Sequence, residues 1–163
     1  MNLCRDAEAS GSLEPDFTQC VWTLETLEIT QQLGQYLARH LPRGSILLLQ
    51  GELGAGKTSL VQGLAQACGI AEPITSPTFA LAQHYPDGNP PLVHLDLYRL
   101  EGAGSADELF LQEEEEARAM GALMAVEWPE RLRLALPEAW RLELSYLKTG
   151  RRAQLTPPKN AST

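Results

Sequence analysis

Apolar residues occur along the chain in patterns that predict strands and helices. Continuous apolar runs at 46–49 and 123–126 have the length of strands that are covered on both faces. Over 91–99 apolar and polar residues alternate, which places Val93, Leu95 and Leu97 on one face of a strand. Shorter strands are expected at 19–23, over about seven residues after a polar turn at 74–79, and in a hairpin of 139–146 with 151–156.

Helical spacing of apolar residues predicts helices between these strands. One helix is expected between Thr26, which is a suitable N-cap, and the helix breaker at 42–44. A second follows Thr58 and ends at Gly69. Residues 1–18 mix Ser, Gly, Pro and acidic residues without periodicity, so the sequence predicts a flexible leader. One domain is then expected at 19–156, followed by a disordered tail at 157–163.

A third helix is predicted in an acidic stretch. Ser105 and Glu108 have the spacing of a capping box, which places the helix start at Ser105. The run Glu113–Glu116 is interpreted as a solvated helix face, and the alternative is an acidic docking surface for a basic partner.

Residues 51–58, Gly-Glu-Leu-Gly-Ala-Gly-Lys-Thr, join the first apolar run to the second helix and satisfy G-x-x-x-x-G-K-[ST]. Glycines let the backbone N–H groups converge on an anion, and the helix N-terminus adds partial positive charge. Lys57 is expected to reach the β- and γ-phosphates, and the Thr58 hydroxyl to ligate Mg²⁺. The candidate nucleotide-binding residues here are Gly51, Glu52, Leu53, Gly54, Ala55, Gly56, Lys57, Thr58 and Ser59.

Two later strands each end in an acidic residue, Asp96 and Glu127. In an open α/β sheet, ligands bind at the carboxyl ends of strands, so both carboxylates are candidates for holding Mg²⁺ or polarising a water molecule. The spacing does not assign these roles. His94 is interpreted as an orienting or packing residue, and Trp128 as either a core aromatic or a lid over the nucleotide site.

The segment Ser76-Pro77-Thr78-Phe79 has two interpretations. Ser-Pro pairs initiate turns, which makes an ordinary turn the simpler interpretation. In the other, the hydroxyl of Ser76 or Thr78 senses the γ-phosphate or the metal as a switch.

Composition narrows the function classes. The 163 residues have a net charge of −8, and three of the 13 basic residues are lysines, which argues against stand-alone nucleic-acid binding. No apolar run approaches the length of a membrane span. Three scattered cysteines suggest free thiols in a reducing cytoplasm. The absence of an Asn-Lys-x-Asp motif disfavours a GTPase.

The chain resembles the TsaE family, also called YjeE-type ATPases. The resemblance extends over residues 21–156, most of the chain, and rests on four segments: the loop 51–58, Ser76-Pro77-Thr78-Phe79, the segment 94–100 and Glu127-Trp128-Pro129-Glu130. It implies an α/β fold of the P-loop NTPase type, with three layers and a mixed, mainly parallel central sheet. It also implies an ATPase that supports synthesis of threonylcarbamoyladenosine, the modified base beside the anticodon of certain tRNAs. Such a protein would bind a TsaB–TsaD heterodimer and reset it without transferring the threonylcarbamoyl group.

The resemblance also implies roles for individual residues. Thr58 and Glu127 would ligate Mg²⁺, and Asp96 would support the metal or the attacking water. Ser76 and Thr78 become a plausible switch, and Thr26 and Arg151 would meet the nucleotide. The alternatives are a non-catalytic ATP-sensing scaffold and a small-molecule kinase. The kinase is disfavoured because only Arg118 is basic between Glu101 and Glu127, where an arginine-bearing lid would be expected.

Overall fold

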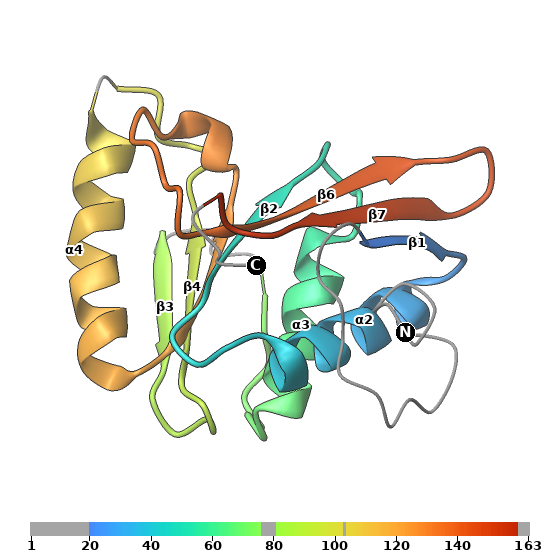
Figure 1. The fold of residues 1–163 in the computed structure, drawn as a ribbon, viewed down its shortest axis with the longest axis horizontal. Helices are drawn as coiled ribbons and strands as arrows, with labels where there is room; N and C mark the ends of the chain where they lie inside the picture. The colour runs from blue at the N-terminus through green and yellow to red at the C-terminus, as the bar shows by residue number, and fades with distance from the viewer. Residues whose placement is uncertain (1–19, 76–80, 103, 160–163) are drawn as a thin grey trace.

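A mixed β-sheet with helices on both faces forms the described part of the chain (Figure 1). The computed structural model describes residues 20–75, 81–102 and 104–159, so the expected leader and the residues after Lys159 lie outside it. In chain order the elements are β1 (Cys20–Leu24), α2 (Leu27–His40), β2 (Ile46–Gln50), α3 (Lys57–Ala67), β3 (Ala82–Tyr85), β4 (Leu92–Asp96), α4 (Ser105–Met120), β5 (Leu123–Glu127), the 3₁₀ turn η1 (Pro129–Arg131), β6 (Trp140–Tyr146) and β7 (Arg151–Thr156).

The sheet has the strand order β1-β7-β6-β2-β5-β4-β3. Its four central strands, β6, β2, β5 and β4, are parallel, whereas β3 at one edge and β7 and β1 at the other are antiparallel to their neighbours. The predicted hairpin is present as β6 and β7. This arrangement confirms the mixed sheet that the sequence predicted.

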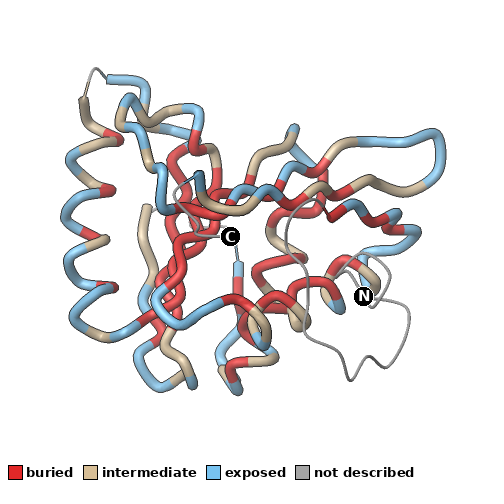
Figure 2. The backbone as a smooth tube through the Cα atoms, viewed as in Figure 1, coloured by how far each residue is buried: buried red, intermediate tan, exposed pale blue. Residues whose placement is uncertain are grey.

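The two faces of the sheet are buried in two separate hydrophobic clusters. Leu47 and Leu49 of β2 point into the cluster that includes α2 and α3, while Ile46 and Leu48 point into the cluster that includes α4. Because side chains alternate along a strand, a continuous apolar run serves both clusters. Figure 2 shows this burial along the central strands. The three layers expected from the sequence are therefore present.

The ends of two helices test the capping predictions. Thr26 caps α2 as predicted, since its hydroxyl accepts a hydrogen bond of 3.1 Å from the Ile29 N–H. The capping box predicted at Ser105 is wrong, although α4 does begin at that residue. Its N-cap is Gly104, whose φ of 82° is left-handed, and the Ser105 hydroxyl donates to the Gly102 carbonyl instead.

The acidic helix differs from the expected solvated face at one position. Glu113 is buried, and its carboxylate pairs with the imidazole of His84 on β3, whereas Glu115 and Glu116 are exposed. Residues spaced by three or four positions share a helix face, so Glu113 lies with Phe110 and Ala117 on the side that packs against the sheet. The strand after the turn at 74–79 is also shorter than expected, with four residues.

Candidate functional site

Three neighbouring strands end at the same edge of the sheet and bring the candidate residues together. β5 lies between β2 and β4, with Glu127 opposite Asp96 on β4 and opposite Leu49 on β2. The loop 51–56 therefore begins beside the two strand-end carboxylates, as expected for the carboxyl ends of parallel strands.

Backbone geometry in the loop explains its glycines. Gly54 and Gly56 have φ angles of 80° and 107°, which are strained for other residues. A Cβ at Gly51 would lie 2.8 Å from the Leu144 carbonyl oxygen. The β6–β7 hairpin supports the loop from outside, because the Tyr146 hydroxyl donates to the Leu53 carbonyl (2.8 Å) and Arg151 Nη2 donates to that of Gly54 (3.0 Å).

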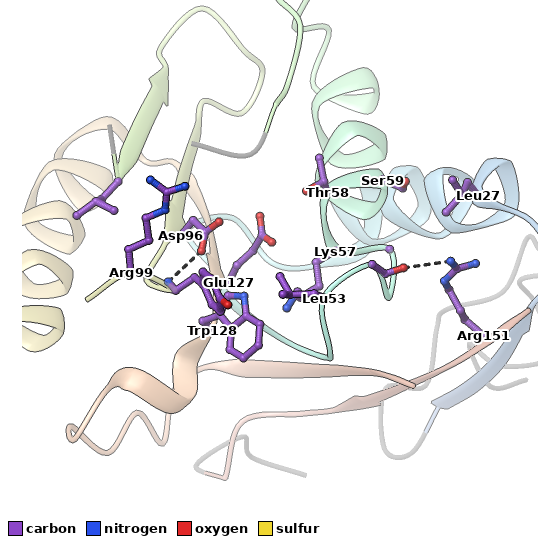
Figure 3. Close-up of a pocket in the computed structure, with 14 residues that line it drawn as sticks. Leu27, Leu53, Lys57, Thr58, Ser59, Asp96, Arg99, Glu127, Trp128 and Arg151 are labelled. Carbon is purple, nitrogen blue, oxygen red and sulfur yellow. Dashed lines mark hydrogen bonds between the residues drawn. The ribbon is translucent and has the colours of Figure 1, made fainter. Parts of the chain in front are cut away.

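A cavity of about 530 Å³ lies between this loop and the strand ends (Figure 3). Its predicted lining residues are Leu53, Gly54, Gly56, Lys57, Thr58, Ser59, Asp96, Glu127, Trp128 and Arg151. In Figure 3 the two carboxylates face the start of α3, and Arg99 and Arg151 lie towards opposite ends of the view. These residues come from four separate segments of the chain and share one cavity, whose volume is typical of a small-molecule site.

Lys57, the first residue of α3, is almost fully buried. Its ammonium donates to the Gly51 carbonyl and lies 3.9 Å from the centroid of a Trp128 ring, a cation–π contact. Burial lowers the pKa of Lys57, while the negative charges of Glu127, Glu130 and Asp96 oppose this shift. The lysine is therefore a desolvated cation at the cavity wall.

The two carboxylates are both buried but have different partners. Asp96 Oδ1 accepts a hydrogen bond of 3.0 Å from the Tyr98 N–H, which follows the strand end directly. Glu127 Oε2 lies 2.6 Å from Nε2 of His94, a fully buried side chain. This contact is consistent with the orienting role that the sequence suggested for His94.

Trp128 has a backbone φ of 60° and ψ of 51°, and it is the one non-glycine residue with positive φ in the described ranges. For a bulky residue this left-handed conformation is strained by about 1–3 kcal/mol, and such strain is frequent at functional sites. Its side chain is half-buried, contacts the Tyr98 ring at 4.8 Å between centroids and lines the cavity. Trp128 therefore has both a packing contact and a cavity-facing surface.

Some predicted residues lie outside the cavity lining. The side chain of Ala55 is buried, and the Thr26 hydroxyl is occupied by its cap hydrogen bond. Gly51 and Glu52 line another cavity of about 470 Å³, and Trp128 lines both cavities. Ser76 and Thr78, the predicted switch, lie outside the described residues.

Four lining residues were not predicted from the sequence, namely Leu27, Leu81, Tyr98 and Arg99. The strand alternation gave a signal for Tyr98, because it places this residue on the same face as Asp96. Leu27 directly follows the predicted cap. Leu81 gave no signal of its own, since its position depends on how β3 pairs with β4 at the edge of the sheet. Arg99 lies in the segment 94–100, which contributed to the resemblance, but no role was assigned to it.

The donor atoms at the cavity suit a hard cation bound together with phosphates. Thr58, Asp96 and Glu127 all line it, and hydroxyl and carboxylate oxygens are the ligands that Mg²⁺ prefers. Among the described residues no three His, Cys, Asp or Glu side chains form a group that could hold a metal by themselves. Because Mg²⁺ usually binds through one or two carboxylates plus substrate phosphates, this donor set fits a nucleotide-bound Mg²⁺.

Among the described residues, no helix is long and apolar enough to cross a membrane.

A family model and individual relatives of known family all match this chain to the same family. The family model "Threonylcarbamoyl adenosine biosynthesis protein TsaE" matches residues 24–154. The TsaE protein of Synechocystis sp. PCC 6803 is 51% identical over 113 residues, which cover 67% of this chain and 69% of that protein. The TsaE protein of Bacillus subtilis is 34% identical over 132 residues, covering 81% of this chain and 80% of its own.

The fold also has a counterpart among solved structures. The crystal structure of YdiB from Bacillus subtilis superposes with a TM-score of 0.69 at 29% identity and covers 88% of each chain. Together with the sequence matches, this similarity shows that the chain belongs to the TsaE family of threonylcarbamoyladenosine biosynthesis proteins.

Proposed function

We propose that this chain is a Mg²⁺-dependent ATPase that supports tRNA threonylcarbamoyladenosine modification by binding and resetting a TsaB–TsaD complex. In this proposal it does not transfer the threonylcarbamoyl group itself. The observation that supports the ATPase is the shared cavity, which brings Lys57 and Thr58 of the loop to the strand-end carboxylates of Asp96 and Glu127.

Each part of the cavity then has a role in binding ATP. The backbone N–H groups of residues 51–56 and the N-terminus of α3 would bind the phosphates, and Lys57 would offset their negative charge. Thr58 and Glu127 would ligate Mg²⁺, which neutralises charge that develops on the transferring phosphoryl group. Asp96 would support the metal or orient the attacking water. Arg151 and Trp128 would border the nucleotide.

The proposed protein partner is supported by the role of the family in threonylcarbamoyladenosine synthesis and by the small number of basic residues in this sequence. Threonylcarbamoyladenosine is made on tRNA, yet the chain has a net charge of −8 and no basic run of the kind that binds nucleic acid. A protein partner would therefore supply the contact with tRNA. We expect slow hydrolysis by the chain alone and faster hydrolysis with TsaB–TsaD.

The test is ATP turnover by the purified protein, alone and with TsaB–TsaD. We expect Lys57→Ala to lower the stimulated rate by about 10²-fold or more, because a charged donor at the phosphates is removed. Lys148→Ala, which removes an exposed lysine, should leave that rate unchanged. ATP binding without turnover in either condition would contradict the ATPase and favour the ATP-sensing scaffold. Phosphate transfer to a small-molecule acceptor would favour a kinase instead.

A further inference from the structure

A buried histidine contacts one of the two strand-end carboxylates. His94 lies on β4, two residues before Asp96, and its side chain has no exposed surface. Its Nε2 is 2.6 Å from Oε2 of Glu127 on the adjacent strand, and the Glu127 side chain is only 3% exposed. The two side chains thus form a buried polar pair, of which Glu127 also lines the cavity.

The other ring nitrogen suggests that this histidine has a role beyond packing. His94 Nδ1 is buried and has no hydrogen-bond partner in the described part of the chain. A buried polar atom without a partner destabilises the fold, and an apolar side chain at this position would avoid that cost. An apolar side chain would, however, leave Glu127 Oε2 without its partner in the same interior.

The direction of the hydrogen bond follows from the chemistry of the pair. A carboxylate that ligates a metal can only accept hydrogen bonds, so in this pair Nε2–H of His94 is the donor and Oε2 of Glu127 is the acceptor. With Oε2 engaged by His94, Oε1 is the oxygen left for another ligand. Figure 3 shows the Glu127 carboxylate directed towards the space between Asp96 and the start of α3, which carries Thr58.

We propose that His94 is a positioning residue for metal binding: its Nε2–H holds Oε2 of Glu127 and thereby directs Oε1 to the Mg²⁺ of bound nucleotide. This inference rests on the proposed function, because it assumes that Glu127 ligates the metal. Hydrogen bonds from neighbouring side chains orient metal ligands in this way, and losing one typically lowers metal affinity or activity about 10–100-fold.

Two amide variants provide a matched test. The His94→Gln side chain can extend an N–H donor towards Glu127, whereas that of His94→Asn is one methylene shorter and falls short of it. The measurement is the dissociation constant of a slowly hydrolysed ATP analogue by calorimetry, once with Mg²⁺ and once with EDTA. We expect His94→Asn to reduce the affinity gained from Mg²⁺ by about 10–100-fold, with little change in EDTA, and His94→Gln to recover much of that gain.

A double-mutant comparison asks whether His94 acts through Glu127. In a Glu127→Gln background, His94→Asn should cause no further loss of the Mg²⁺-dependent gain. The inference would be overturned if His94→Asn reduced the affinity gained from Mg²⁺ equally in the wild-type and Glu127→Gln backgrounds. It would also be overturned if His94→Asn left that gain unchanged in the wild-type background. In both cases the proposed function would stand. Equal weakening with Mg²⁺ and with EDTA would also overturn it, because the whole site would then be affected. A wild-type protein that gains no affinity from Mg²⁺ would instead overturn the proposed function and the role of His94 with it.

Discussion

The ammonium of Lys57 is desolvated, and this burial has a consequence for stability. The pKa of Lys57 is lowered by burial, despite the opposing charges of Glu127, Glu130 and Asp96, whereas in the unfolded chain it returns to an ordinary value near 10.5. Between these two pKa values the unfolded chain binds more protons than the folded chain, so this group makes the free energy of unfolding rise with pH. The charged lysine therefore destabilises the fold at neutral pH, which is expected where a residue is retained for function.

The first prediction replaces Lys57 by methionine, which has a similar shape and no charge. In nucleotide-free buffer at pH 7–8 we expect Lys57→Met to have a free energy of unfolding equal to or above that of the wild type, with the difference shrinking towards pH 10. Urea denaturation across this pH range measures it, and Lys148→Met, at an exposed position, is the control. A clear loss of stability at pH 8 would mean that the contacts of Lys57 with Gly51 and Trp128 outweigh its desolvation.

Helices α2 and α3 approach each other through glycines, and this contact supports the helix that carries Lys57 and Thr58. A Cβ built on Gly63 would lie 2.0 Å from the Gln31 carbonyl oxygen, and one on Gly34 would lie 2.2 Å from that of Leu60. Two glutamine pairs, Gln31–Gln62 and Gln35–Gln66, bridge the same two helices, with N–O distances of 2.9 and 2.7 Å. Because both close contacts are with backbone atoms, a larger side chain has to push the helices apart.

The second prediction concerns Gly63→Ala. In a free helix this change would stabilise by about 1 kcal/mol. Here we expect a net loss of about 1–3 kcal/mol, because overpacking forces the backbones of α2 and α3 apart. Denaturation measures the loss, with Glu115→Ala at an exposed position of α4 as the control. A stability at or above that of the wild type would show that the helices can separate without penalty.

At the scale of the whole molecule, the sequence predicted what depends on neighbouring residues and missed what depends on distant ones. Strand periodicity located β2, β4 and β5, and local chemistry located the cap at Thr26. The burial of Glu113 was missed because its partner, His84, lies 29 residues away on an edge strand. The cavity position of Leu81 was missed for the same reason, since the pairing of β3 with β4 brings it there.

The net negative charge of the chain predicts that it does not bind tRNA by itself. With 21 acidic and 13 basic residues, the chain as a whole is expected to repel polyanions, because nucleic-acid binding depends on cationic side chains that displace counterions from the phosphates. If a protein partner provides the contact with tRNA, the purified chain alone should show no binding of labelled, unmodified tRNA by fluorescence anisotropy at 150 mM salt. The double variant Glu115→Lys/Glu116→Lys, altered at two exposed positions of α4, is the control for how far added positive charge alone can create affinity. Wild-type binding whose affinity falls steeply with salt would contradict the partner-mediated contact. Such binding would mean that this chain contacts tRNA directly. TsaB–TsaD would then be needed to stimulate ATP hydrolysis and not to provide the contact with tRNA.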